Sequence, residues 1–177
     1  MEAIFYWLGF DAVTLHPYSD KVALQPFLER ADKCSIILCW TSNPGSREFQ
    51  DLEVGDKLVW EVVAECICRE WNMHNNCMLV VAANYPDELK RARKLVDEMT
   101  LLILGVGTQS ESIHRAVAAG MNAEHKGMIL NCSGSIIFAE DPHAVARQMQ
   151  EEINRWVRIS NNFLTFNSIA VNFLSGY

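Results

Sequence analysis

Two glycine-containing segments carry the residues best suited to bind an anion. The segment LGVGTQSES places Gly105 and Gly107 two residues apart, with Gln109 close behind, and NCSGSIIFA contributes Ser133 and Gly134. Glycine lets the backbone approach a ligand with its N–H groups exposed, and the glutamine adds a side-chain amide. The two segments therefore predict a phosphate cradle if they follow neighbouring strands. The alternative is that both are tight turns that need glycine for geometry alone.

A third segment, TSNPGS, offers the hydroxyl groups of Thr41 and Ser42. Either hydroxyl could donate a hydrogen bond to a base or a sugar. Asn-Pro-Gly is also an ordinary turn sequence, which is the reading that the pattern alone favours.

Other site chemistries lack the residues that they require. No His, Cys, Asp and Glu residues stand at metal-ligand spacing at these positions, so no metal site is predicted. Ser42 does not lie in a Gly-x-Ser-x-Gly turn, and the five histidines are scattered. The six cysteines lie mostly in apolar runs without a Cys-x-x-Cys pair, which indicates free thiols in a reducing compartment.

Composition limits the class of protein. The 177 residues are 50% hydrophobic and 21% charged, which is typical of one globular domain. The net charge of −7 argues against binding to nucleic acid or an anionic membrane through the overall field. No run approaches the about 20 apolar residues of a membrane span, and the N-terminus lacks the pattern of a signal peptide. The sequence therefore predicts a soluble, cytoplasmic protein.

Strand and helix patterns alternate along the chain. Short apolar runs predict strands at 10–16, 34–40, 77–83, 100–105 and 126–132. Amphipathic patterns predict helices at 20–29, 56–71, 86–99, 111–120 and 142–156. This order predicts an α/β fold with a parallel sheet, either doubly wound or part of an eight-stranded barrel. In both, ligands bind where the strands end, which is where the glycine segments fall.

Two helices carry specific expectations. In the helix at 86–99, Leu89, Ala92, Val96 and Met99 should face the core, and the basic residues Lys90, Arg91, Arg93 and Lys94 should face solvent. The helix at 56–71 should bury a stripe that comprises Leu58, Val59, Val62, Val63, Cys66 and Ile67.

Six segments, in order and at compatible spacing, resemble the orotidine 5′-phosphate decarboxylase family, and in particular its longer bacterial branch. They are FDAVTLHPY, SDKVALQPFLE, TSNPGSREFQDL, ANYPDELKRARKLV, LGVGTQSES and NCSGSIIFA, which together run from Phe10 to about Arg155. The resemblance implies a (β/α)8 TIM barrel, of which this chain would hold about the last five strand–helix units.

The resemblance also implies a function. The family removes CO2 from orotidine 5′-monophosphate to give UMP in pyrimidine synthesis, without a metal or an organic cofactor, usually as a homodimer. By position, Ser42 would contact the pyrimidine. Gln109 and the backbone around Gly107, Ser133 and Gly134 would hold the phosphate.

Two of the chain's departures from the family pattern bear directly on function. The family's alternating Lys/Asp catalytic array precedes the segment that matches at Phe10, so no catalytic residue is predicted in this chain. Gly134 stands where the family has a phosphate-binding arginine. The alternatives are therefore a non-catalytic, nucleotide-phosphate-binding relic, or a different barrel that acts on a sugar phosphate.

The expected domains are a partial barrel at 1–157 and an apolar C-terminal tail at 158–177. A partial barrel leaves two sheet edges open. We therefore expect the chain to need a complementary N-terminal chain, or to self-associate.

Overall fold

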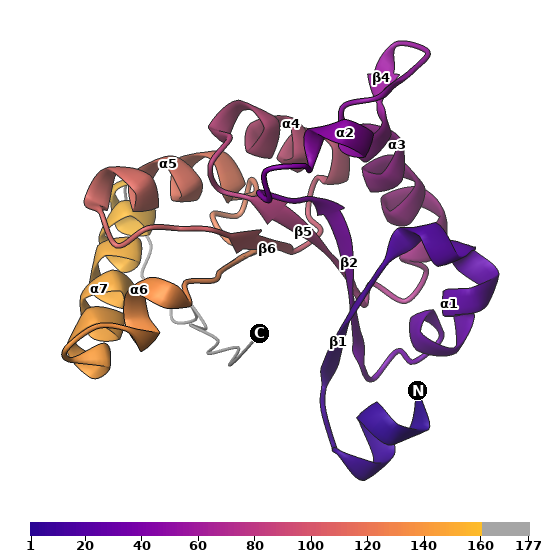
Figure 1. The fold of residues 1–177 in the computed structure, drawn as a ribbon, viewed down its shortest axis with the longest axis horizontal. Coiled ribbons are helices and arrows are strands. Elements are labelled where there is room, and N and C mark those ends of the chain that lie inside the picture. The colour runs from indigo at the N-terminus through magenta and orange to yellow at the C-terminus, as the bar shows by residue number, and fades with distance from the viewer. Residues whose placement is uncertain (161–177) are drawn as a thin grey trace.

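Five parallel strands form a curved sheet in the computed structural model, which describes residues 1–160 (Figure 1). The strands are β1 (Ala12–Leu15), β2 (Cys34–Trp40), β5 (Cys77–Ala82), β6 (Leu101–Leu104) and β7 (Met128–Leu130). They lie in the order β1-β2-β5-β6-β7, so each main strand pairs with the next one along the chain. All five predicted strands are confirmed.

Helices cover the outer side of this sheet (Figure 1). They are α1 (Asp20–Leu28), α3 (Val59–Cys66), α4 (Pro86–Val96), α5 (Ser110–Gly120) and α7 (Pro142–Ser160). All five predicted helices are present. Because α7 continues to Ser160, it crosses the domain boundary expected after residue 157. Residues 161–177, the rest of the expected tail, lie outside the described residues, and that boundary remains a prediction.

Several short elements join these units. A π-helical turn (Ala3–Trp7) precedes β1, a 3-10 turn (Pro17–Ser19) follows it, and another π-helical turn (Ile67–Trp71) extends α3. Between β2 and α3 lie α2 (Arg47–Gln50) and a hairpin of β3 (Glu53–Val54) with β4 (Lys57–Leu58). A single turn of helix, α6 (Gly134–Ile137), follows β7.

The two faces of the sheet differ in burial. On the helix side, Ile37, Leu79, Leu101 and Ile103 are fully buried and belong to one hydrophobic cluster. On the opposite face, several side chains are only half-buried, namely Ile36, Leu38, Met78, Leu104 and Ile129. Strands β1 and β7 each pair on one side only. Within residues 1–160, this arrangement is that of a barrel segment whose inner face and edges are open.

A β-bulge ends β2 and turns two side chains toward the helices. The pairing shifts between Leu38 and Trp40, so that Cys39 and Trp40 lie opposite a single partner residue. The Trp40 ring then packs against Trp60 of α3 at 5.4 Å and against Tyr85 at 5.7 Å between ring centroids. The bulge therefore fixes the place where the chain leaves the sheet into the Thr41–Ser42 loop.

Helix α3 buries a face that only partly matches the predicted stripe. Ile67 is buried as predicted, but so are Trp60, Ala64 and Trp71, which the stripe did not include, and Val62 is 37% exposed. Leu58, Val63 and Cys66 are half-buried against the core. Because apolar residues occur nearly all round this helix, periodicity did not single out one face. The two tryptophans bury the most apolar surface and decide the orientation.

Arg93 corrects the second helix expectation. Its neighbours Leu89, Ala92, Val96 and Met99 are buried as predicted, but Arg93 is itself only 8% exposed. Its guanidinium donates to four carbonyl oxygens, at Gly120 (2.9 Å), Asp97 (2.5 Å), Met99 (2.7 Å) and Gly127 (2.6 Å). Burial lowers the pKa of Arg93 to about 10, so it remains charged at neutral pH. Arg93 thus satisfies carbonyls that helix ends and turns leave without donors.

Candidate functional site

The carboxyl ends of five neighbouring parallel strands meet at one edge of the sheet. The loops that leave this edge contain all of the residues predicted to bind substrate. They are Thr41 and Ser42 after β2, Gly107 and Gln109 after β6, and Ser133 and Gly134 after β7. The topology therefore brings the three predicted segments to the same edge, as expected for residues that serve one ligand.

Gly105 is the point at which three of these loops converge. It has a φ of +77°, which favours glycine. A Cβ atom added here would lie 3.2 Å from Oδ1 of Asn84 and 3.8 Å from Oγ of Ser42. The loops after β2, β5 and β6 thus present an amide and a hydroxyl beside a backbone that carries no side chain.

Asn84 was not among the predicted site residues. The sequence places ANYPDE at the end of a strand, but an asparagine just before Tyr-Pro is typical of a turn. Only the register of β5 with β6 brings it beside Gly105. The signal that could have identified it is its position two residues after the last strand residue, Ala82.

Thr41 and Ser42 differ in how the fold uses them. The Thr41 N–H donates to Gln50 Oε1 (2.9 Å), and the Thr41 hydroxyl accepts from Gln50 Nε2 (2.8 Å) and donates to Asn43 Oδ1 (2.6 Å). These bonds hold the loop together. Within residues 1–160, Ser42 Oγ has no hydrogen-bond partner. Of the two, Ser42 is therefore the group left available for a ligand.

The segment after β6 leads into an uncapped helix. The Gly107 N–H donates to Ser112 Oγ (3.2 Å), which closes the loop on its own helix. Gln109 occupies the N-cap position of α5, but no side chain caps the helix. The first helical hydrogen bond of α5 is donated by the Ile113 N–H to the Gln109 carbonyl (3.1 Å). The N–H groups of the preceding turn stand at the positive end of the helix dipole, where an anion is stabilised.

Glu152 of α7 anchors the start of α5. Its carboxylate accepts a hydrogen bond from the Ser110 hydroxyl and another from Trp156 Nε1 (2.8 Å), and Arg155 lies 3.6 Å away. The Ser110 bond, followed by those of Trp156 and Arg155, lowers the pKa of Glu152. The Trp156 ring also stacks on His114 of α5, with 4.0 Å between centroids. Helix α7 therefore holds the turn that offers the free N–H groups.

The loop after β7 is open around Gly134. Ser133 Oγ donates to Asn131 Oδ1 (3.2 Å), and Gly134 begins α6. Among residues 1–160, a Cβ atom at Gly134 would meet only a ring carbon of Phe138, at 3.9 Å. Position 134 therefore has space for a larger side chain, although the glycine present offers only its backbone.

A cavity of about 270 Å³ lies at this same edge. His16, Tyr18, Thr41, Gln50 and Trp60 are among the residues that line it, and the His16 and Tyr18 rings stack at 5.0 Å. The Thr41 loop thus borders a hollow of its own, on the β1 side.

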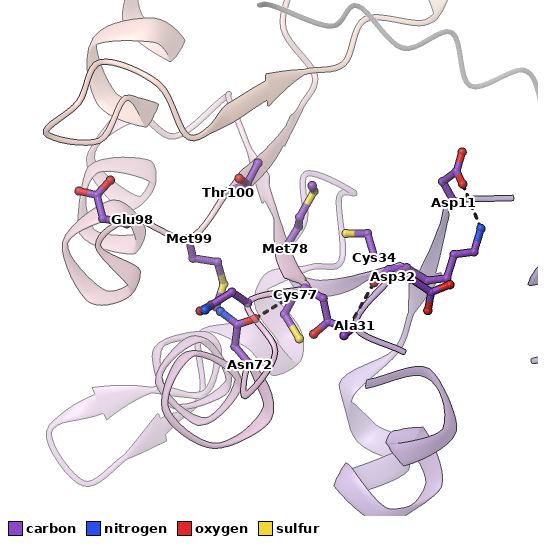
Figure 2. A pocket seen from close by; sticks show the side chains of 13 residues that line it. Asp11, Ala31, Asp32, Cys34, Asn72, Cys77, Met78, Glu98, Met99 and Thr100 are labelled. Carbon is purple, nitrogen blue, oxygen red and sulfur yellow. Dashed lines mark hydrogen bonds and ion pairs between the residues drawn. The ribbon is translucent and has the colours of Figure 1, made fainter. Parts of the chain in front are cut away.

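A larger cavity, of about 520 Å³, lies at the opposite edge (Figure 2). Its lining comes from the amino ends of the strands and includes Asp11, Cys34, Cys77 and Thr100. At this end Asn76 donates from Nδ2 to the carbonyls of three residues, Leu28, Arg30 and Lys33. Asn76 therefore stabilises the turn between α1 and β2. None of the predicted site residues lines this larger cavity.

Two further classes of site find no support in residues 1–160. That part of the chain has no group of three or more His, Cys, Asp and Glu residues able to hold a metal ion, and no helix long and apolar enough to cross a membrane. All six cysteines are free. Burial raises the pKa of Cys39 to about 12 and those of Cys34 and Cys77 to about 11, so these three thiols are protonated and unreactive at neutral pH.

Known proteins resemble this chain in both sequence and structure. The orotidine 5′-phosphate decarboxylase of Aromatoleum aromaticum is 41% identical over 143 residues, which are 80% of this chain and 53% of that protein. The enzyme of the same name from Janthinobacterium is 40% identical over 156 residues, 84% of this chain and 58% of that protein. The chain thus spans about half the length of the curated relatives it matches.

Solved structures agree. The OMP decarboxylase of Leishmania donovani superposes with a TM-score of 0.83 at 37% identity, over 88% of this chain and 60% of that one. The UMP synthase of the same organism gives 0.83 at 38% identity, over 88% of this chain and 35% of that one. A family model described as orotidine 5′-phosphate decarboxylase / HUMPS family matches residues 1–149. The chain therefore belongs to this family, and its sheet and helices are part of the family's α/β barrel.

Proposed function

We propose that this chain supplies the phosphate- and base-binding part of an orotidine 5′-phosphate decarboxylase, which converts orotidine 5′-monophosphate to UMP and CO2 in pyrimidine synthesis. The observation that carries the proposal is the uncapped start of α5, behind the Gly105–Gln109 loop, at the edge where Ser42 and Asn84 meet. An anion site beside polar side chains suits a nucleotide monophosphate.

In this proposal the phosphate binds at the start of α5. The free N–H groups of its first turn and the Gln109 amide donate to the phosphate oxygens, and the backbone of Ser133 and Gly134 contributes from the neighbouring strand end. The ring then lies toward Gly105, close to Ser42. Phosphate contacts remote from the reacting carbon would supply binding energy to the transition state.

The proton-transfer residues are not part of this assignment. By the family resemblance, a Lys/Asp array acts from strand ends that precede the segment matching β1, and a lysine protonates the carbanion. The strand-end loops of residues 1–160 offer amides, hydroxyls and backbone N–H groups. We therefore propose that the chain alone binds a nucleotide monophosphate, and that turnover needs the complementary part of the barrel.

The open edges indicate what that part must do. Strands β1 and β7 each have one unpaired side, and the inner face carries half-buried apolar side chains. Additional strands, on a complementary N-terminal chain or on a second copy, would pair with those edges and cover that face. We place such an assembly in the cytoplasm, where pyrimidine synthesis requires it.

The direct test combines binding with turnover. Titration calorimetry of the 1–177 chain with UMP should show binding that inorganic phosphate competes away, and an absorbance assay with orotidine 5′-monophosphate should show no decarboxylation. Tighter binding of ribulose 5-phosphate than of UMP would instead favour a sugar-phosphate barrel. Absence of binding to any of these phosphates would reject the proposal for this chain, and turnover by the chain alone would reject the need for a partner.

A further inference from the structure

Asn84 is a polar side chain at the strand-end edge that the fold itself does not use. Within the described residues its carboxamide has no hydrogen-bond partner. Two buried asparagines, Asn76 and Asn122, are by contrast bonded within the fold. Asn76 donates to three carbonyls, and the Asn122 carboxamide bonds to Glu98 and accepts from the N–H groups of Glu124 and Lys126. Asn84 is itself exposed, so its carboxamide is accessible to a ligand at the functional edge.

The backbone on both sides holds Asn84 in place. The Ala83 N–H donates to the Leu104 carbonyl (2.8 Å), so the pairing of β5 with β6 continues up to the residue before Asn84. Immediately after it, Tyr85 is the N-cap residue of α4, and its ring packs edge-on against Trp40. The backbone that carries Asn84 is thus held in place on both sides, as a residue that recognises a ligand requires.

Asn84 and Ser42 both lie close to Gly105. Asn84 Oδ1 is 3.2 Å, and Ser42 Oγ 3.8 Å, from the position that a Gly105 Cβ would occupy. Gly105 directly follows the last residue of β6, whereas the proposed anion site lies at the start of α5, which begins at Ser110. A nucleotide whose phosphate sits at α5 therefore has its ring, and not its phosphate, nearest these two side chains.

We propose that Asn84 recognises the imide edge of the pyrimidine ring, together with Ser42, and so sets the specificity for the base. This inference rests on the proposed function. The imide edge presents an N–H donor flanked by carbonyl acceptors. A carboxamide offers one acceptor and two donors, so it can accept from the N–H and donate to a carbonyl at once, and the Ser42 hydroxyl can serve the remaining carbonyl. A site built to hydrogen-bond a ligand group discriminates strongly against analogues that lack it.

The test separates the base from the phosphate. Calorimetric titrations of the full 177-residue chain would compare UMP with ribose 5-phosphate, which has the sugar and phosphate but no ring. For the wild type, UMP should bind more tightly. Asn84→Ala and the similarly sized Asn84→Leu should each lower UMP affinity roughly tenfold, since one polar contact with the ring is lost, and leave ribose 5-phosphate affinity unchanged. Asn154→Ala on α7 is the matched control and should change neither affinity.

Each other outcome is decisive. If both Asn84 variants bind UMP within twofold of the wild type, Asn84 does not read the base, and the proposed function stands. If they weaken both ligands equally, Asn84 shapes the phosphate loop and the inference is again overturned. If the wild type binds neither ligand, the proposed function fails and the inference falls with it.

Discussion

The Ser110 hydroxyl donates a hydrogen bond to the Glu152 carboxylate, and so joins the first residue of α5 to the middle of α7. Trp156 donates to the same carboxylate and stacks on His114, which gives the two helices a second point of contact. Since Ser110 directly follows Gln109, the geometry of the proposed phosphate site depends on a helix that contributes none of the predicted substrate-binding residues.

This contact predicts a specific pH dependence of stability. The pKa of Glu152 is lowered in the folded protein, so its contribution is complete above the ordinary glutamate pKa of about 4.3 and is lost as the pH falls through the lower, folded value. Urea unfolding between pH 7 and pH 3 should show that Glu152→Gln is less stable than the wild type at pH 7 and that the two converge in acid. Glu151→Gln, an exposed neighbour, is the control. A constant difference across this range would contradict the prediction.

Gly134→Arg should strengthen nucleotide binding. The position is helical and has open space, so an arginine fits, and its guanidinium can give charge-assisted hydrogen bonds to phosphate. UMP affinity should rise roughly tenfold or more. Ser135→Arg adds the same charge one residue further on and should give a smaller, salt-sensitive gain. Equal gains for the two variants would indicate a general charge effect and not a phosphate contact at position 134.

Gly105→Ala should impair both stability and binding. Its φ of +77° strains any side chain, and the new methyl group would crowd Asn84 and approach Ser42. Gly55, in the turn between β3 and β4, has a φ of +66°, and no atom of the described residues lies within 4 Å of an added Cβ. Both alanine variants should lose about 1 kcal/mol or more of unfolding free energy. Only Gly105→Ala should also weaken UMP binding, and unchanged UMP affinity would separate Gly105 from the site.

Arg93→Met should be among the most destabilising substitutions on α4. It leaves four buried or half-buried carbonyls without their donor, which should cost about 2–4 kcal/mol in urea unfolding. Lys94→Met, on the exposed face of the same helix, should stay within about 0.5 kcal/mol of the wild type. A comparable loss from the two variants would mean that the Arg93 bonds contribute little.

The order and type of the main elements follow from local pattern. The runs at 34–40 and 77–83 are apolar on both faces and short, and they form β2 and β5 almost to the residue. The amphipathic stretch from Pro86 buries the predicted stripe of α4. Strand alternation also placed the three candidate segments at one sheet edge, because parallel strands share the direction in which they end.

What the sequence did not predict depends on tertiary partners. Arg93 looks like a solvated charge until the carbonyls of distant turns are brought around it. Asn84 becomes a candidate site residue only when the register of β5 against β6 sets it beside Gly105. The sequence alone does not distinguish the hydroxyl groups of Thr41 and Ser42. Only the position of Gln50 in the fold shows that Thr41 forms hydrogen bonds within its own loop.

The sequential strand order has a consequence for how the chain acquires its structure. Each main strand finds its partner in the next strand–helix unit, so every pairing of the sheet closes a loop of modest length, and no strand waits for a distant one. Units can add one after another as they leave the ribosome, each using the exposed edge of its predecessor as a template. The β7 edge, at which the last described strand pairs, is therefore the edge along which the sheet would grow.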